Sequence, residues 1–390
     1  MADNILIVHG GGPTAVINAS LYGAVKEAKK YPQLGHIYAA KNGTGGLLRG
    51  ELIDLGNVPD AELDLLLQTP GSAIGTSRDQ LEQQEYDRMA EVLAEREIKY
   101  VLFNGGNGTM DTCGKLFKTC QAMHMDVRVM GIPKTMDNDI AITDHSPGFA
   151  SAARYMAQSV KEVCADVKGL PIHVVVIEAS GRNAGWITAA SALADDGDGL
   201  GPDLIYLPER PFDEDRYIEG IKKLLERKSG IVVVASEGLK DAAGKPVVEP
   251  IFTVDRATYF GDVSAHLANL VIKRLGYKAR GEKPGLLGRA SISLQSPVDV
   301  EEARLAGELA CRAAIKGESG KMVAFRRISD APYEMEPFLV DIEEVMMHER
   351  TMPDAYINSE GNGVTEAFKE WCRPLLGESL PRMISFNELE

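Results

Sequence analysis

The chain has 390 residues, of which 44% are hydrophobic and 25% charged, and these values are typical of a globular protein long enough for two domains. Its formal net charge of −15 argues against nucleic acid as a partner, because the phosphates would be repelled. No apolar stretch approaches the roughly 18 unbroken residues of a membrane span, and the N-terminus lacks the basic region and cleavage site of a signal peptide.

The cysteines are scattered along the chain, odd in number, and include no CxxC pair. Reduced and mostly buried thiols in a cytoplasm are therefore expected, and a structural zinc site is not. If an anionic substrate binds, local Arg, Lys and backbone N–H groups must overcome the global negative charge. The five cysteines are Cys113, Cys120, Cys164, Cys311 and Cys372.

Short apolar runs alternate with helical patterns in chain order. A strand at 4–11 is followed by a helix at 14–30, and a strand at 99–106 by a helix at 109–123. Near-continuous Val/Ile runs of this kind indicate parallel sheets that helices cover on both faces. Further strands are predicted at 126–133, 172–180, 203–208 and 230–238, an amphipathic helix at 214–228, surface loops at 239–249 and 281–285, and a packing segment at 350–390.

Glycine-rich turns follow three of the predicted strands, with the sequences GGGPT at 10–14, NGGNGT at 104–109 and SGRNAG at 180–185. Ligands of open α/β sheets bind at the carboxyl ends of strands. Glycine lets backbone N–H groups approach a phosphate closely, and the following helix adds its N-terminal dipole. One such turn has a purely steric explanation, but three favour phosphate binding. The chain has no GxxxxGK[ST] motif and no GxGxxG after the first strand, which weakens a dinucleotide-binding interpretation.

The segment PKTMDND at 133–139 adds two carboxylates at the end of another predicted strand. If the segment is extended, as its proline encourages, Asp137 and Asp139 point the same way. One carboxylate could then accept a hydroxyl proton while the other helps to hold Mg²⁺ between phosphates, as phosphoryl transfer to an alcohol requires. The alternative is an Asx-rich turn that its own side chains cap. The glycine-rich turn upstream favours the first interpretation.

Together these motifs resemble the phosphofructokinase family, and the similarity runs along most of the chain. The wording of GGPTAVINAS and TDHSPGF is similar to the bacterial branch that includes pyrophosphate-dependent enzymes. The resemblance implies an α/β fold of two Rossmann-like three-layer domains with mainly parallel sheets and an active site in the interdomain cleft. The matching stretches are GGGPTAVINAS, PGSAIGTSR, NGGNGT, GIPKTMDNDI, TDHSPGF, IEASGRNAGW, VVVASEG and LLGR.

The resemblance also implies a division of the chain. Residues 1–145, completed by roughly 255–300, would bind the donor phosphates, and residues 146–254 would bind the sugar phosphate. Residues 301–390 would form C-terminal helices that pack on both domains. A homodimer or homotetramer is expected, because sugar sites in the family borrow residues across a subunit interface.

The implied activity is the glycolytic transfer of a phosphoryl group to the 1-hydroxyl of fructose 6-phosphate, with Mg²⁺ bridging the donor phosphates. By motif position, Asp137 would be the base, Thr135 a sugar contact, and Asp139 a group that positions substrate or metal. Arg78 would neutralise the transferring phosphoryl group, and Lys134 stands beside the base. The donor-binding set is Gly11, Gly12, Gly106, Asn107, Gly108 and Thr109, with Asn107 where most members place a metal-associated Asp.

On the sugar side, the resemblance assigns a phosphate loop, a group that binds sugar hydroxyls, and two arginines whose planar forks match the 6-phosphate. Three positions depart from the family pattern and bear on affinity and sugar identity. Ser180 replaces a Met, Leu286 replaces a His or Tyr, and His173 stands where many relatives carry an Arg contributed across a subunit interface. The sugar-binding set is Ser180, Gly181, Arg182, Glu237, Arg280 and Arg289.

The donor is judged from the residue after Asn107. Pyrophosphate-dependent relatives carry an Asp there, in the space that the α-phosphate of ATP needs, and Gly108 leaves that space open. ATP is therefore the expected donor and diphosphate the alternative. Lys134 is the residue that pyrophosphate users carry, although some ATP-dependent relatives combine Gly with Lys. Thr44 replaces an aromatic residue that stacks near the nucleotide in some ATP enzymes.

Two other functions are open. Lipid and nucleotide kinases share a GGDGT-like turn but lack the PKTMDND and GRNAGW companions. A regulatory paralogue that binds sugar phosphate or nucleotide would account for Asn107, Ser180 and Leu286. The presence of Asp137 and Arg78 opposes it, because a dead enzyme has no need of the base.

Overall fold

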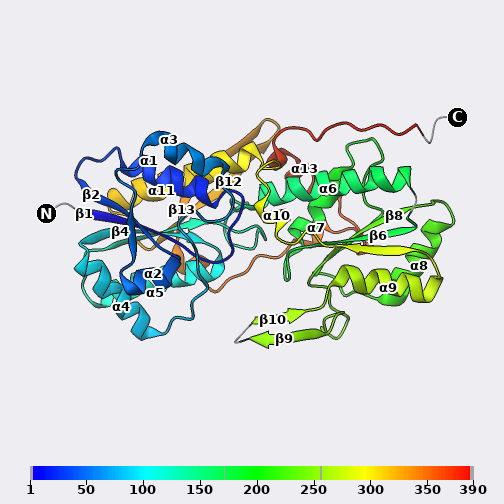
Figure 1. Cartoon of the computed structure of the whole chain (residues 1–390), viewed down its shortest axis with the longest axis horizontal. Coiled ribbons are helices and arrows are strands. Elements are labelled where there is room, and N and C mark those ends of the chain that lie inside the picture. Colours follow the sequence, from blue (N-terminus) through cyan, green and yellow to red (C-terminus); the bar gives the residue numbers. More distant parts are fainter. Residues whose placement is uncertain (1–2, 171, 255–256, 387–390) are drawn as a thin grey trace. The chain divides into compact units, whose positions relative to one another are not determined.

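The computed structural model describes residues 3–170, 172–254 and 257–386, and the chain divides into two compact units (Figure 1). Unit 1 consists of Met1–Ser151 and Arg289–Arg350, and unit 2 of Ala152–Gly288 and Thr351–Glu390. The expected return to the first domain at 255–300 therefore differs from the observed division. The chain returns to unit 1 at Arg289. The segment from there to Arg350 supplies a long helix and two strands of that unit.

Within its described residues, unit 1 is built on a seven-stranded sheet with the order β13-β12-β5-β4-β1-β2-β3. The pairing is parallel from β2 through β1, β4 and β5 to β12, and the edge strands β3 and β13 are antiparallel. The strands are β1 (Asp3–His9), β2 (Leu34–Ala40), β3 (Leu52–Asp54), β4 (Ile98–Gly105), β5 (Arg128–Pro133), β12 (Lys321–Asp330) and β13 (Tyr333–Asp341). The helices are α1 (Ile17–Ala28), α2 (Gly43–Arg49), α3 (Asp60–Asp64), η1 (Leu65–Gln68), α4 (Gln83–Glu95), α5 (Asn107–Ala122), α10 (Leu287–Ala290), α11 (Pro297–Ile315) and α12 (Ile342–Val345).

The central strands are buried on both faces, as their unbroken apolar runs predict. Ile5 and Ile7 of β1 pack into a core that α1 and α11 cover. Leu6 and Val8, which point the opposite way, pack into a second core with α4 and α5. Successive side chains of a strand alternate between faces, so a fully apolar strand requires a helical layer on each side. Unit 1 is therefore the expected three-layer structure.

Helices α1 and α11 approach each other to backbone contact. A Cβ added at Gly23 would lie 2.0 Å from the carbonyl oxygen of Arg304, and one added at Gly307 would lie 2.0 Å from that of Ser20. Any side chain at either position would force the two helices apart. These glycines keep one face of the sheet closely covered.

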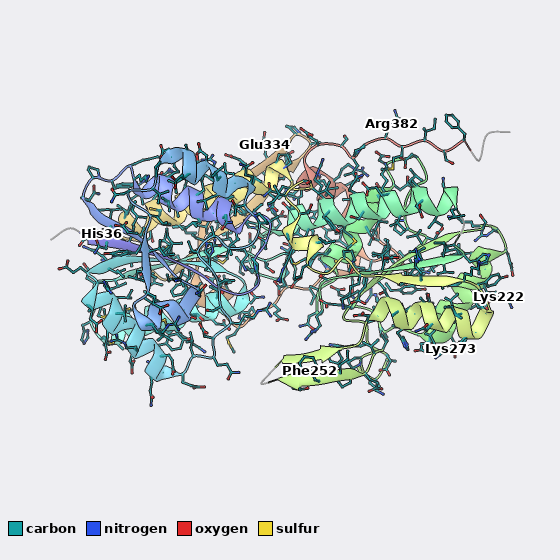
Figure 2. All side chains as sticks on the ribbon, in the orientation of Figure 1. His36, Lys222, Phe252, Lys273, Glu334 and Arg382 are labelled. Atoms are coloured by element: carbon teal, nitrogen blue, oxygen red, sulfur yellow. The ribbon has the colours of Figure 1, made fainter. Side chains whose placement is uncertain are left out.

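Unit 2 contains a four-stranded parallel sheet with the order β11-β6-β8-β7 and a separate hairpin, β9–β10, that carries the exposed Phe252 (Figure 2). Helices α8 and α9 pack on one face of the sheet, and α6 runs along the other (Figure 1). The strands are β6 (Val174–Ala179), β7 (Leu204–Tyr206), β8 (Ile231–Ser236), β9 (Pro250–Val254), β10 (Ala257–Phe260) and β11 (Ala279–Glu282). The helices are α6 (Phe149–Gly169), α7 (Trp186–Ala190), η2 (Ser191–Ala194), α8 (Glu214–Leu225), α9 (Val263–Leu275), η3 (Asp354–Tyr356), α13 (Glu366–Cys372) and η4 (Arg373–Leu376).

The C-terminal segment packs on unit 2 through aromatic rings. The ring centroids of Trp186 and Trp371 lie 5.0 Å apart, and Tyr356 stacks on Trp371 at 5.9 Å. Offset and edge contacts of this kind stabilise a core beyond the area that they bury. The described part of 350–390 is thus a packing segment.

Two expectations for the fold are wrong. Residues 301–390 are expected to form C-terminal helices, but residues 321–341 contain the hairpin β12–β13, whose outer half is polar and gives a weak strand signal. The loop expected at 281–285 begins with the last two residues of edge strand β11, which is exposed along most of its length.

All five cysteines are buried without a disulfide, and none of the helices in the described residues is long and apolar enough to cross a membrane.

The close contact of α1 and α11 yields a stability prediction. Gly307→Ala should lower the free energy of unfolding by about 1–3 kcal/mol, because the new methyl group overlaps a carbonyl of the facing helix. Thermal and urea unfolding monitored by circular dichroism would measure the change. Gly220→Ala in α8 is the matched control, since its Cβ would meet only Leu204 Cδ1 at 3.9 Å. The control should be neutral or stabilising by up to about 1 kcal/mol. Equal stability of the two variants would contradict the prediction.

Candidate active site

Three neighbouring parallel strands of unit 1 end side by side, and each is followed by one of the predicted motifs. Because β5, β4 and β1 are adjacent in the sheet, residues 10–14, 106–109 and 134–139 meet at its carboxyl edge. Residues 10–13, 106–109 and 134–137 line a cavity of about 400 Å³. This volume is within the range of small-ligand sites, and the position is the one at which open α/β sheets bind ligands.

A buried, neutral histidine directly precedes the first glycine turn. His9 ends β1 in full burial, with Nδ1 2.8 Å from Ser72 Oγ and Nε2 3.3 Å from Asn104 Nδ2. Burial, reinforced by the charge of Lys134, lowers the pKa of His9 to about 3. Gly11 has a φ of 75°, which favours glycine, and its N–H donates to Ser77 O at 2.9 Å.

Lys134 connects the first turn to the segment that carries the two aspartates. Its buried ammonium donates to the carbonyl oxygens of Gly10 at 3.1 Å and Gly12 at 2.5 Å. Burial lowers the pKa of Lys134 to about 8, with Asp137 opposing and Arg78 adding to that effect. The charge is retained at neutral pH, where it favours an anion in the cavity.

Two arginines lie beside Gly12. A Cβ added at Gly12 would be 3.0 Å from Arg289 Nη1 and 3.2 Å from Arg78 Nη2. Burial and the neighbouring charge of Arg78 both lower the pKa of Arg289. Two cations held this close, with the ammonium of Lys134 lining the same cavity, indicate a site for a multiply charged anion. Arg289 thus lines the cavity of unit 1, and its assignment to the sugar 6-phosphate stays a prediction.

The second glycine turn forms the N-terminus of α5. Gly106 is its N-cap and Asn107 its first residue, so the free N–H groups and the dipole of the helix point into the cavity. A Cβ added at Gly108 would meet no atom within 4 Å, so the position is open, as expected. The side chain of Thr109 fills the space above Gly10, where an added Cβ would lie 2.3 Å from its hydroxyl.

The carboxylates of PKTMDND do not lie in an extended segment, so the expectation that they point the same way is wrong. Asn138 adopts a left-handed conformation with φ 54°, and its buried Oδ1 accepts from the N–H of Ser146 at 3.0 Å. Asp137 lines the cavity and its N–H donates to Thr135 Oγ1 at 3.1 Å, whereas Asp139 does not line it. The bend separates the two carboxylates into different surroundings.

Asn107 and Asp139 could hold a metal ion in part. Asn107 Nδ2 donates to the carbonyl of Asp139 at 3.2 Å, and within the described residues neither Asn107 Oδ1 nor Asp139 Oδ1 has a hydrogen-bond partner. Buried oxygen atoms without a donor suit Mg²⁺. The same part of the chain has no cluster of three or more His, Cys, Asp or Glu suited to a metal. The residues therefore fit an ion held mainly by substrate oxygens and water.

Asp79 and Ser77, which sequence reasoning did not single out, form a hydrogen-bonded group with Thr44 in the cavity wall. Thr44 Oγ1 and Ser77 Oγ donate to the same carboxylate oxygen of Asp79, at 2.5 Å and 2.6 Å. All three line the cavity. The only sequence signal was that Asp79 directly follows Arg78.

In unit 2, two loops join at the carboxyl ends of β6 and β8. The N–H of Gly181 donates to Glu237 Oε1 at 3.1 Å, and Ser236 Oγ donates to the carbonyl of Gly181 at 2.8 Å. Gly181 has a φ of 113°, which requires glycine, and Arg182 lies 5.4 Å from the ring centre of Phe260. Together with Ser180, these are the predicted sugar-side residues that unit 2 brings together.

Three other sugar-side positions lie elsewhere in unit 2. Arg280 pairs with Val175 in the register of β11 and β6, four residues before the end of β6. His173 precedes β6 at the opposite end from Gly181, and its ring packs edge-on to Tyr277 at 5.1 Å. Leu286 is 66% exposed. Since a strand rises about 3.3 Å per residue, Arg280 is roughly 13 Å from the loop along the sheet.

Comparison with known proteins gives consistent matches. The family described as phosphofructokinase matches residues 4–299. The pyrophosphate–fructose 6-phosphate 1-phosphotransferase of Xanthomonas campestris pv. campestris is 38% identical over 99% of this chain and 96% of its own length. The corresponding enzyme of Rhodospirillum rubrum is 36% identical over 97% of this chain and 95% of its own. The crystal structure of a pyrophosphate-dependent phosphofructokinase from Nitrosospira multiformis superposes with a TM-score of 0.90 at 35% identity, covering 99% and 95% of the two chains.

The cavity geometry predicts that Gly12 and Gly108 tolerate a methyl group differently. Gly12→Ala should displace the arginines and weaken binding of inorganic diphosphate about tenfold, the value of one charge-assisted hydrogen bond. Gly108→Ala should change the dissociation constant less than about twofold, because its methyl group meets open space. Isothermal titration calorimetry would measure both. A loss in Gly108→Ala as large as that in Gly12→Ala would refute the assignment of the arginine pair.

Proposed function

Because the chain belongs to the phosphofructokinase family, we propose that it transfers a phosphoryl group from inorganic diphosphate to the 1-hydroxyl of fructose 6-phosphate. The observation that carries the proposal is the position of Asp137 in one cavity with Lys134, Arg78 and Arg289. A base beside three cations is the arrangement that phosphoryl transfer to an alcohol requires.

Each residue of the cavity has a defined part in the proposed reaction. The sugar hydroxyl attacks the terminal phosphorus of the donor, its proton passes to the carboxylate of Asp137, and the bond to the departing orthophosphate breaks. Lys134 and the two arginines neutralise the charge that spreads over the transferring oxygens. The N–H groups at the start of α5 hold the donor. Asn107 and Asp139 would help to hold Mg²⁺, which would neutralise further charge on the donor when bound.

The sugar is proposed to bind at the joined loops of unit 2. Arg182 offers donors for the phosphate, and Glu237, whose Oε1 accepts from Gly181, can accept further hydrogen bonds from sugar hydroxyls. Arg280 lies too far along the sheet to reach this loop within one chain. Its contact with the 6-phosphate therefore requires a second copy, in keeping with the expected homodimer or homotetramer.

Diphosphate replaces ATP as the preferred donor. The sequence favoured ATP because of Gly108, but full-length relatives with about 36–38% identity are named for pyrophosphate. Lys134, which ties the two carbonyls of the first turn, is the residue that pyrophosphate users carry. ATP remains a second candidate on one observation, the open space beside Gly108.

Donor kinetics decide between the two candidates. The wild-type protein is expected to show a higher kcat/KM with diphosphate than with ATP when fructose 6-phosphate is saturating. A higher value with ATP would establish the second candidate. Gly108→Asp should lower kcat/KM for ATP at least about tenfold through charge repulsion and leave diphosphate within about threefold. Gly108→Ala is the uncharged control, and equal losses for both donors in Gly108→Asp would contradict this donor assignment.

The assignment of the base has its own test. Asp137→Asn keeps the shape of the side chain but cannot accept the proton, so kcat should fall by about 10²–10⁴-fold with little change in KM. Asp139→Asn is the comparison. Asp139 does not line the cavity, its Oδ1 has no hydrogen-bond partner and its carbonyl accepts from Asn107, so the variant should raise the Mg²⁺ concentration needed for half-maximal rate. Undiminished turnover by Asp137→Asn would end the proposed mechanism.

A further inference from the structure

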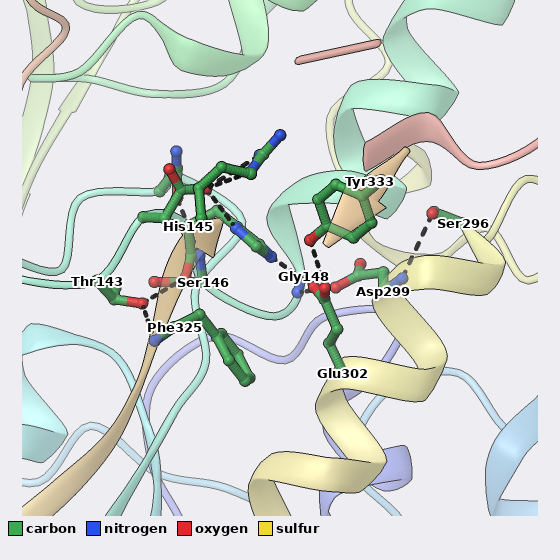
Figure 3. Close-up of polar contacts among 12 residues, drawn as sticks. Thr143, His145, Ser146, Gly148, Ser296, Asp299, Glu302, Phe325 and Tyr333 are labelled. Carbon is green, nitrogen blue, oxygen red and sulfur yellow. Dashed lines mark hydrogen bonds and ion pairs between the residues drawn. The ribbon is translucent and has the colours of Figure 1, made fainter. Parts of the chain in front are cut away.

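A fully buried histidine lies behind the segment that carries Asp137. His145 has no exposed surface and sits between two carboxylates, with Nδ1 2.8 Å from Asp144 Oδ2 and Nε2 2.5 Å from Glu302 Oε2 (Figure 3). Asp144 is its chain neighbour, whereas Glu302 lies on α11, 157 positions away. The imidazole therefore joins a loop to a distant helix. A neutral imidazole has one N–H, so only the protonated ring can donate to both carboxylates.

Charged and aromatic side chains surround the imidazole and its two carboxylates. Arg327 donates to Asp144 Oδ2 at 3.0 Å, and Tyr333 donates its hydroxyl to the second oxygen of Glu302 at 2.5 Å. Phe325 stacks on the imidazole at 5.6 Å. Arg327 is shared between Asp144 and Asp330, so the imidazolium is the cation that contacts both Asp144 and Glu302. Removing one member of a buried charged group is costly, so the four groups act together.

A further carboxyl group, Asp299, anchors the end of the same loop to α11. Its two oxygens accept from the N–H groups of Gly148 and Ser151, both at 2.8 Å. Burial raises the pKa of Asp299 to about 6. Segment 143–148 is thus fastened to the helix at two points, at His145 through Glu302 and at Gly148 through Asp299 (Figure 3).

The fastened segment also holds the residues around the base. The N–H of Ser146 donates to Asn138 Oδ1, and the N–H of Thr135 donates to the carbonyl of Pro147 at 3.1 Å. Asp137 lies between these two contacts. A non-glycine residue in the left-handed region, such as Asn138, persists only where its surroundings hold it. Segment 143–148 supplies that support.

We propose that His145 is a positioning residue for phosphoryl transfer, whose imidazolium clamps segment 143–148 to α11 and so holds Asp137 against the donor. This inference rests on the proposed function of Asp137. It assigns no contact with substrate to His145. A displaced base raises the free energy of the transition state and leaves the binding of the substrates unchanged. Loss of the clamp should therefore lower kcat and not raise KM.

The clamp has a defined pH range. Burial lowers the pKa of His145, but Glu302 and Asp144 outweigh burial and raise the pKa to about 9, above the ordinary value of 6.5. The stabilising charge is therefore fully present below pH 6.5 and is lost as the pH rises through about 9. Burial and Glu302 raise the pKa of Tyr333. The other groups that face this cluster are Tyr333, Arg327, Asp299, Asp330 and Arg350.

The test compares His145→Gln with wild type between pH 6 and 10. The variant should retain its fold by circular dichroism, lose about tenfold in kcat at pH 7, and keep both KM values within about twofold. The ratio of wild-type to variant kcat should fall towards one above pH 9, where wild type loses the charge as well. His266→Gln is the matched control, because His266 makes a similar contact with Glu214 at 2.9 Å in unit 2. It should leave kcat and the pH profile unchanged.

Two further measurements separate the possible failures. Asp137→Asn in the same assay tests the base itself: if it keeps its turnover, the proposed function fails, whereas if it is inactive and His145→Gln has normal kcat, only the clamp is overturned. A pH-independent loss in His145→Gln would also overturn the clamp. If His145→Gln does not fold, ¹⁵N NMR of labelled histidine in wild type decides. One imidazole should stay doubly protonated at pH 8, and its absence would refute the proposal.

Discussion

The ammonium of Lys134 joins the two parts of the candidate site that have to act together. It lies one residue past β5 and donates to two carbonyls of the turn that follows β1. These hydrogen bonds connect the segment that carries Asp137 to the first glycine turn. The strand order β5-β4-β1 brings these loops together, and the buried cation keeps the carbonyls turned inward. The N–H groups of Gly10 and Gly11 donate to the carbonyls of Asn104 and Ser77, so the turn is fixed and the cations beside it face an anion. Every proposed role of Asp137 depends on this arrangement.

The same cation explains how a strongly acidic chain can hold an anionic ligand. The net charge of −15 is spread over the molecule, whereas Lys134, Arg78 and Arg289 meet around one small cavity. Interaction between charges falls with distance and with solvent screening, so cations that line the cavity outweigh remote exposed carboxylates. Local geometry therefore decides what binds.

The parallel strands could be predicted because burial on both faces leaves an unbroken apolar run, as in β1, β4, β6 and β8. Hairpin β12–β13 could not, because half of it is exposed and its polar residues hide the pattern. The members of the cavity followed from motifs after strands. The bend at Asn138 did not, because it depends on contacts with segment 143–148. The positions of Asp79 and Arg289 in the cavity could not be predicted either, because they depend on contacts between segments distant in sequence.

The interrupted course of unit 1 has a consequence for synthesis. Its sheet needs β12 and β13, and its helical layer needs α11, so the unit lacks a complete core until residue 341 has left the ribosome. The parallel sheet of unit 2 ends at residue 282 and becomes available earlier. Domains usually mature in the order in which they are translated. Here neither unit follows that order simply: the strands of unit 1 wait for β12 and β13, and Trp186 of unit 2 waits for the aromatic partners Tyr356 and Trp371 that are translated last.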